Sequence, residues 1–177
     1  MSSLKVIGID PGSQITGYGL LEETGNRIQF LEAGIIDVRH ESDFNLRLQH
    51  IHQHILEIIN RHRPCEAAIE SPFQHKNIQS TLKLGKTIGV ISLAVTSKNI
   101  PLVEYPPRTV KQAIVGSGSA EKEQVQYMIS SLLHIPKESS LDATDALAVA
   151  WCHLHHWRLK KALQRSKSDF SSYRTNS

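Results

Sequence analysis

Near its amino terminus the chain reads Val6-Ile7-Gly8-Ile9-Asp10-Pro11-Gly12, and this segment is the clearest indication of the fold. Its short apolar run is typical of a buried β-strand, and the Pro-Gly pair ends that strand in a turn directly after Asp10. A second run of this kind, Ala67-Ala68-Ile69-Glu70, also ends at an acid and is followed by Ser71-Pro72. The two segments therefore predict strands that each place a carboxylate at their carboxyl end.

Outward from these segments, the sequence predicts three more strands, at 16–22, 27–38 and 102–105, with a hairpin turn at 24–26. Apolar residues at helical spacing predict helices at 44–61, 77–97, 108–115, 120–134 and 142–163. Helices between the third, fourth and fifth strands allow parallel crossovers, whereas the first hairpin makes antiparallel neighbours. We therefore expect an α/β fold with a five-stranded mixed sheet flanked by helices.

The chain of 177 residues has the length and composition of one globular domain, with 40% hydrophobic and 21% charged residues. No apolar run approaches the ~18 residues that a membrane span needs. Residues 1–10 lack the apolar stretch of a signal peptide, so we expect a cytoplasmic protein. The two cysteines provide neither a disulfide framework nor a zinc quartet.

Positive charge is concentrated at the C-terminus. Residues 158–177 carry six basic side chains and one acid, whereas residues 1–157 carry 14 basic and 16 acidic side chains, a net charge of −2. We predict that residues 1–157 form the domain, and that residues 158–177 form a basic tail, the end of the last helix followed by disordered chain. This tail is either a solvated end or a second contact for a nucleic acid.

Four acids are predicted to meet at one edge of the sheet. Asp10 and Glu70 end parallel strands, whose carboxyl ends share the edge where open α/β sheets bind ligands. Asp142 and Asp145 lie three residues apart on one face of the last helix, which can bring them to the same edge. Taken singly, Asp10 is explained as a turn residue and Glu70 as a surface acid. Asp142 and Asp145 are explained as acids that the helix dipole favours. Together they would repel one another and require cations.

The chemistry of such a cluster follows from its ligand atoms. Carboxylate oxygens suit hard ions, namely Mg²⁺ or Mn²⁺. Two such ions stabilise both the attacking and the leaving oxygen of an in-line phosphoryl displacement. The sequence therefore predicts two Mg²⁺ ions per active site, with Mn²⁺ as a substitute, and a phosphodiester substrate.

Six motifs occur in an order that resembles RuvC-type Holliday junction resolvases, which belong to the ribonuclease H-like superfamily. They are Gly8-Ile9-Asp10-Pro11-Gly12, Ala68-Ile69-Glu70-Ser71-Pro72-Phe73, Leu82-Lys83-Leu84-Gly85, Val110-Lys111-Gln112, Gly116-Ser117-Gly118-Ser119-Ala120-Glu121-Lys122 and Asp142-Ala143-Thr144-Asp145-Ala146-Leu147-Ala148. The resemblance extends from about Val6 to Trp157, which is nearly the whole predicted domain.

The resemblance implies a ribonuclease H-like homodimer that makes paired symmetric nicks in four-way DNA junctions, during homologous recombination and DNA repair. It implies a Mg²⁺-dependent endodeoxyribonuclease that leaves 5′-phosphate and 3′-hydroxyl ends. A branch-migration motor and its junction-binding platform, of the RuvA and RuvB type, would be its partners. The family's acidic positions match Asp10, Glu70, Asp142 and Asp145, and some members carry His at the third of these positions.

The resemblance also implies DNA contacts. Phe73 matches an aromatic residue that inserts at the opened centre of the junction, where stacking contributes about 1–3 kcal/mol per base. The alternative role for Phe73 is to close its loop against the core. The basic residues in matching segments are Lys76, Lys83, Arg108, Lys111 and Lys122. Each alone is a common solvated charge, but Lys111 or Lys122 is also suited to neutralise charge in the transition state.

Two other functions remain as alternatives. One is a catalytically silent module that binds branched DNA, although a pure binder has no reason to gather four acids against phosphates. The other is a related nuclease that acts on RNA, against which Phe73, Lys76 and the segment 111–122 favour the junction. Within the junction hypothesis, we expect the helix 77–97, with Gly85 and Gly89 one turn apart, to form part of the dimer interface.

Overall fold

The computed structural model describes residues 3–71, 77–135 and 140–174, the last ten of these by their backbone. Along the chain the elements are β1 Ser3–Asp10, β2 Ile15–Thr24, β3 Arg27–Asp37, α1 Phe44–His62, β4 Glu66–Glu70, α2 Ile78–Thr96, β5 Leu102–Tyr105, α3 Pro107–Val115, α4 Lys122–Leu133 and α5 Leu141–Arg174. Among these residues, no helix is both long and apolar enough to cross a membrane.

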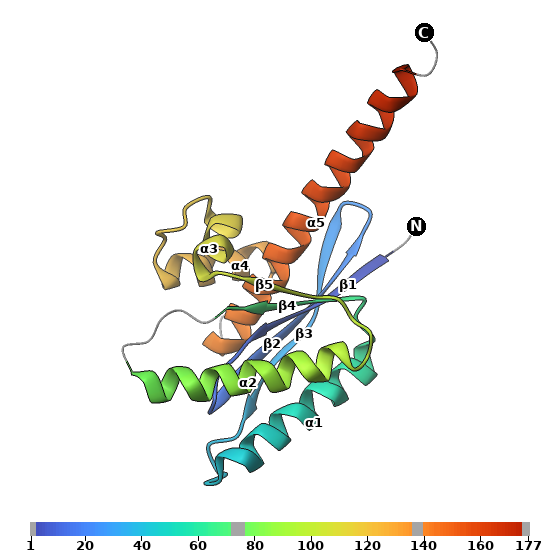
Figure 1. The fold of residues 1–177 in the computed structure, drawn as a ribbon. Coiled ribbons are helices and arrows are strands. Elements are labelled where there is room, and N and C mark those ends of the chain that lie inside the picture. The colour runs from blue at the N-terminus through green and yellow to red at the C-terminus, as the bar shows by residue number, and fades with distance from the viewer. Residues whose placement is uncertain (1–2, 72–76, 136–139, 175–177) are drawn as a thin grey trace.

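The strands form one sheet in the order β3-β2-β1-β4-β5 (Figure 1). The hairpin strands β1, β2 and β3 pair antiparallel, and β4 lies parallel to both β1 and β5. Gly25 adopts the positive φ of 64° in the turn between β2 and β3, a conformation that glycine reaches without a Cβ clash. The predicted five-stranded mixed α/β sheet is therefore confirmed.

Helices cover both faces of the sheet because side chains alternate along β1. Ile7 and Ile9 are fully buried against the face that α1 and α2 cover. Val6 points to the opposite face, in a core shared with Leu147 and Leu154 of α5. Asp10 lies on the α5 side by the same alternation, so the sheet directs its carboxylate toward the last helix.

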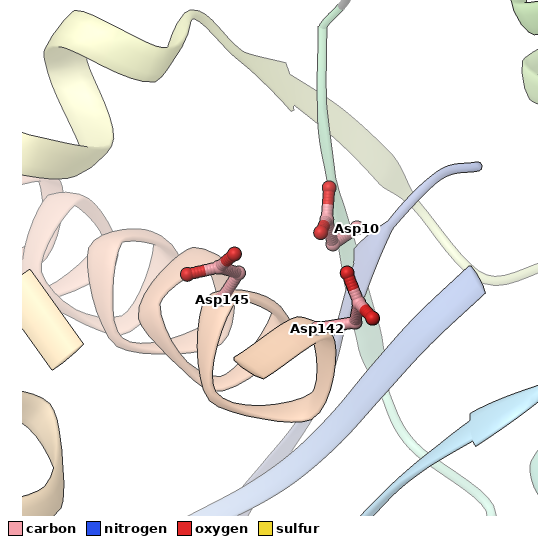
Figure 2. Close-up of side chains that lie close together, drawn as sticks. All are labelled: Asp10, Asp142 and Asp145. Carbon is pink, nitrogen blue, oxygen red and sulfur yellow. The ribbon is translucent and has the colours of Figure 1, made fainter. Parts of the chain in front are cut away.

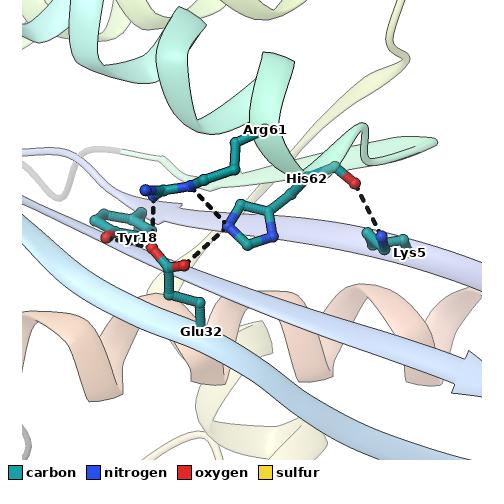
Figure 3. A network of polar contacts seen from close by, with 5 residues as sticks. All are labelled: Lys5, Tyr18, Glu32, Arg61 and His62. Carbon is teal, nitrogen blue, oxygen red and sulfur yellow. Dashed lines mark hydrogen bonds and ion pairs between the residues drawn. The ribbon is translucent and has the colours of Figure 1, made fainter.

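A polar network fastens the end of α1 to the sheet (Figure 3). Glu32 of β3 accepts hydrogen bonds from the Tyr18 hydroxyl at 2.8 Å and from Arg61 at 2.7 Å, and His62 Nε2 lies 2.9 Å from its other oxygen. Lys5 Nζ donates to the His62 carbonyl at 2.9 Å. Burial raises the pKa of Glu32, but the contacts from Tyr18, His62 and Arg61 outweigh it and lower that pKa below its ordinary value. The network lies on the α1 side of the sheet, opposite the α5 side, and has a structural role.

Helix α5 is longer than predicted. It continues to Arg174 instead of ending near Leu163, and its last turns extend beyond the rest of the fold (Figure 1). The predicted end of the helix near Leu163 was therefore too early, while the predicted basic tail stays a prediction. Residues 158–177 contain no Gly or Pro, and extending a helix needs no new nucleation. The division of the chain at residue 157 stays a prediction.

Candidate active site

Three acids from distant parts of the chain meet at the carboxyl end of β1. Asp10 is the last residue of β1, and Asp142 and Asp145 occupy the first turns of α5. One carboxylate oxygen of each lies within 4.8 Å of the others (Figure 2). Figure 2 shows the three carboxylates facing a common space between the strand and the helix. This cluster is the arrangement that the sequence predicted for these three residues.

Glycines on the sheet permit this approach of α5. A Cβ on Gly17 would lie 2.0 Å from the Asp142 carbonyl oxygen, and a Cβ on Gly8 would lie 2.2 Å from the Ala146 carbonyl oxygen. Gly17 also pairs with Asp10 in the β1–β2 register. The helix backbone therefore rests directly on the sheet, and this contact brings Asp142 beside Asp10.

Glu70 joins the cluster from the neighbouring strand. It is the last residue of β4, and the parallel register pairs Ile9 with Ile69 one residue earlier. The structure places it in a pocket lined by Glu70, Pro107, Val110, Lys111, Lys122, Val125, Asp145 and Ala148. Glu70 is not among the three acids that lie within 4.8 Å of one another, but its charge acts on Asp10.

The acids are held where negative charge is costly. Burial raises the pKa of Asp10 to about 8, and repulsion from Glu70, Asp145 and Asp142 adds to the rise. Burial and repulsion from Asp145 raise the pKa of Glu70 to about 7. Oxygen ligands that resist ionisation without a counter-charge fit hard divalent cations, so this donor set suits Mg²⁺ or Mn²⁺.

Two of the predicted basic residues lie beside the acids. Lys122 Nζ is 2.5 Å from Asp145 Oδ2, and its charge lowers the pKa of both Asp10 and Glu70. Lys111 lines the same pocket and donates from Nζ to the Ala120 carbonyl at 2.8 Å. That bond holds the Lys111 ammonium near the acids from α3, while Lys122 approaches from the start of α4.

The other predicted DNA-binding residues are not brought to this pocket. Arg108 is exposed on α3 beneath Gly118, and Lys83 lies on α2 with its ammonium 5.8 Å from the centre of the Phe44 ring. Neither belongs to the residues that line the pocket. Phe73 and Lys76 lie outside the described residues.

Two side chains near the cluster, Gln126 and Arg39, were not predicted from the sequence. Gln126 Nε2 donates to Asp145 Oδ1 at 3.3 Å. Arg39 pairs with Asp37 at 2.6 Å, and its hydrogen bonds to Asp37, the charge of Asp37 and then the charge of Asp142 raise the pKa of its guanidinium. The i, i+4 spacing of Gln126 from Lys122 was the one available signal, because it places both on one face of a helix. Nothing local in the sequence links Arg39 to Asp142.

Comparisons with known proteins agree with this geometry. The family described as crossover junction endodeoxyribonuclease RuvC matches residues 6–153. The crossover junction endodeoxyribonuclease RuvC of Bacteroides fragilis is 48% identical over 151 residues, which cover 84% of this chain and 80% of the relative. The protein of the same name from Geobacter metallireducens is 45% identical over 161 residues, 91% of this chain and 98% of the relative.

Solved structures support the same assignment. The RuvC of T. thermophilus in complex with a Holliday junction substrate matches with a TM-score of 0.83 and 30% identity, over 89% of this chain and 96% of that one. The yeast mitochondrial Holliday junction resolvase Ydc2 matches with a TM-score of 0.70 at 12% identity, over 93% of this chain and 85% of that one, a likeness of fold. The fold is ribonuclease H-like, and the chain belongs to the crossover junction endodeoxyribonuclease RuvC family.

Proposed function

We propose that this chain is a structure-selective endonuclease that resolves four-way Holliday junctions in DNA, in homologous recombination and DNA repair. The observation that carries the proposal is the meeting of Asp10, Asp142 and Asp145 at the end of β1, with Glu70 beside them. A T. thermophilus relative of the same fold is known in complex with a Holliday junction.

The proposed cofactor is Mg²⁺, two ions per active site, with Mn²⁺ as a substitute. When bound, such ions supply Lewis-acid stabilisation of the attacking and leaving oxygens of a phosphodiester. Asp10, Glu70, Asp142 and Asp145 are the residues that would hold them. Because these four carboxylates lie at one edge of the sheet, cleavage is expected there. The expected products are 5′-phosphate and 3′-hydroxyl ends.

The lysines complete the site. Lys122 of α4 and Lys111 of α3 line the same pocket as Glu70 and Asp145. A phosphate that enters the pocket would therefore meet positive charge where these lysines lie. Either ammonium is suited to stabilise the charge that develops on the phosphoryl oxygens. Phe73, Lys76, Lys83 and Arg108 are proposed as DNA contacts farther from the scissile bond.

The proposed assembly is a homodimer formed through α2. Ile78, Leu82 and Leu93 are 76%, 56% and 61% exposed at helical spacing along one side of this helix. A Cβ on Gly85 or Gly89, between them, would meet no atom within 4 Å. This face is open to close approach by the same helix of a second copy, and a two-fold axis would set two active sites against two opposed strands.

Further partners are proposed on the resemblance alone. They are a branch-migration motor and its junction-binding platform, and the cytoplasmic location likewise stays a prediction.

The acids are tested by four isosteric variants: Asp10→Asn, Glu70→Gln, Asp142→Asn and Asp145→Asn. We expect each to bind a synthetic four-way junction but to cut it at least about 10³-fold more slowly, because loss of several kcal/mol of charge stabilisation has that effect on a rate. Glu57→Gln, an exposed acid on α1, is the matched control and should cut normally.

The same assay decides between the alternatives. A junction, a linear duplex and an RNA–DNA hybrid are each incubated with Mg²⁺ and then with EDTA. Preferential, Mg²⁺-dependent nicking of the junction is expected. Undiminished cleavage by Asp10→Asn would contradict the mechanism, and preferential cutting of the hybrid would contradict the substrate.

A further inference from the structure

Helix α4 presents two side chains to one carboxylate of the acid cluster. Lys122 and Gln126 lie one helical turn apart, so both face the start of α5. Lys122 Nζ lies 2.5 Å from Asp145 Oδ2, and Gln126 Nε2 donates to Asp145 Oδ1 at 3.3 Å. Each oxygen of Asp145 therefore has its own partner on α4.

The position of Gln126 is set by the core. Its neighbours Val125 and Ile129 are 5% and 0% exposed, and they pack in the clusters that include Val149 and Leu147 of α5. The backbone of α4 is thus fixed against the helix that carries Asp145. The Gln126 amide reaches the carboxylate from a fixed support, as orientation of a ligand requires.

A carboxylate does not fix its own orientation. The terminal torsion of an aspartate side chain is broad, so the rotation of its two oxygens depends on what they contact. The Asp145 side chain is only 17% exposed, which leaves protein groups as its main partners. Two donors on separate oxygens hold the plane of the carboxylate in one rotation.

The two donors differ in what happens when cations occupy the cluster. Lys122 carries a positive charge, which a divalent cation at the same carboxylate repels. The Gln126 amide is neutral, so its hydrogen bond to Oδ1 is free of that repulsion. With divalent cations bound, the Gln126 amide would therefore remain the contact that orients Asp145.

We infer that Gln126 is a positioning residue, which acts through Asp145 to orient a ligand for divalent metal. This inference rests on the proposed function and deepens it. Partners of this kind, one bond removed from the metal, change metal affinity or activity by about 10–100-fold when they are substituted.

The experiment replaces Gln126 by methionine, which keeps the length of the side chain and removes its donor. Binding of Mn²⁺ to the full-length protein without DNA is measured by the loss of the free-ion electron paramagnetic resonance signal. We expect Gln126→Met to bind Mn²⁺ about tenfold more weakly. Gln112→Met, an exposed glutamine on α3, is the control and should match the unaltered protein.

Two further measurements separate positioning from a structural or DNA-binding role. Thermal unfolding in EDTA and junction affinity in EDTA should not change in Gln126→Met, and raised Mn²⁺ should restore cleavage. If Gln126→Met binds Mn²⁺ as tightly as the unaltered protein, the inference is overturned while the proposed function stands. The proposed metal site itself is overturned if the unaltered protein binds no Mn²⁺. It is also overturned if Asp145→Asn binds Mn²⁺ as tightly as the unaltered protein.

Discussion

Asp10 is partly buried at the end of a strand and also carries a carboxylate that faces other acids, and these two features oppose each other. It ends a strand whose central residues are fully buried, and burial is the largest cause of its raised pKa of about 8. The same placement aims its oxygens at Asp142 and Asp145. A carboxyl in such surroundings favours its protonated form until a cation offsets the charge, so proton and metal compete for one group.

The stability of the metal-free protein should therefore fall as the pH rises. The pKa of Asp10 rises from 3.8 to about 8, and that of Glu70 from 4.5 to about 7. A raised folded-state pKa stabilises the fold fully below the unfolded value, and this stability is lost as the pH rises through the folded value. In EDTA, we expect a lower unfolding temperature near pH 9 than near pH 6.

Two controls accompany that measurement. Asp10→Asn in EDTA should depend less on pH across this window, and added Mg²⁺ should raise the unfolding temperature of the unaltered protein most near pH 9. Equal unfolding temperatures at the two pH values, for a metal-free protein, would contradict the assigned burial of charge.

At the scale of elements, α5 is the part that assembles the site. Its first two turns supply two of the acids, and the segment 142–150 packs across β1 and β2 where glycines replace side chains. Its far end extends beyond the rest of the fold after Arg158, whose Nε lies 2.7 Å from the buried Glu23 carboxylate. One helix thus joins the active site to a basic extension.

Gly17→Ala tests the contact between β2 and α5. The new methyl group would stand 2.0 Å from the Asp142 carbonyl oxygen, so the start of the helix must shift away from Asp10. We expect a loss of about 1–3 kcal/mol in the free energy of unfolding, and cleavage that needs a higher Mg²⁺ concentration to reach half of its maximal rate. Gly85→Ala, where no atom lies within 4 Å, should unfold no more easily than the original. Normal cleavage and stability in Gly17→Ala would contradict the packing.

Truncation after Gln164 tests the extension without disturbing Arg158. It removes Arg165, Lys167 and Arg174 together with Asp169. We expect the logarithm of junction affinity to fall less steeply with the logarithm of salt concentration, by about 0.9 for each phosphate that the extension neutralises. An unchanged slope would identify the extension as a solvated end. Cleavage at saturating junction should persist, because the acids lie at the opposite end of α5.

In the whole molecule, the two sides of the sheet have different proposed roles, catalysis on one side and assembly on the other. Helix α5 covers one side and carries half of the acids, while α1 and α2 cover the other (Figure 1). Apolar side chains remain exposed along α2. The proposed assembly surface is thus separated from the proposed chemistry. A dimer through α2 leaves the acid edge of each copy open to DNA.

The double variant Leu82→Glu and Leu93→Glu tests this surface. Two like charges on each copy should prevent association, so light scattering should report a monomer. Loss of the two-fold arrangement should also turn paired nicks into single, uncoupled ones. Leu132→Glu on α4, a leucine that is 41% exposed, is the control and should stay dimeric. A double variant that remains a dimer would rule out α2 as the interface.

Much of the site could be predicted from the sequence, because the patterns that indicate strands and helices are local. Apolar runs that stop at Asp10 and Glu70 locate two strand ends, and alternation along β1 assigns Asp10 to one face. The i, i+3 spacing of Asp142 and Asp145 places both on one side of α5. These features depend on backbone periodicity, which holds wherever the element sits.

The mixed sheet, the strand ends at Asp10 and Glu70, and the family of the chain all follow from the amino-acid sequence. The contacts of Lys122 and Gln126 with the two oxygens of Asp145, and the position of Lys83 away from the pocket, are visible only in the folded chain. Those contacts depend on how closely α4 and α5 pack and how α5 crosses the sheet. Packing joins residues far apart in the chain, and no local periodicity encodes the distance between them.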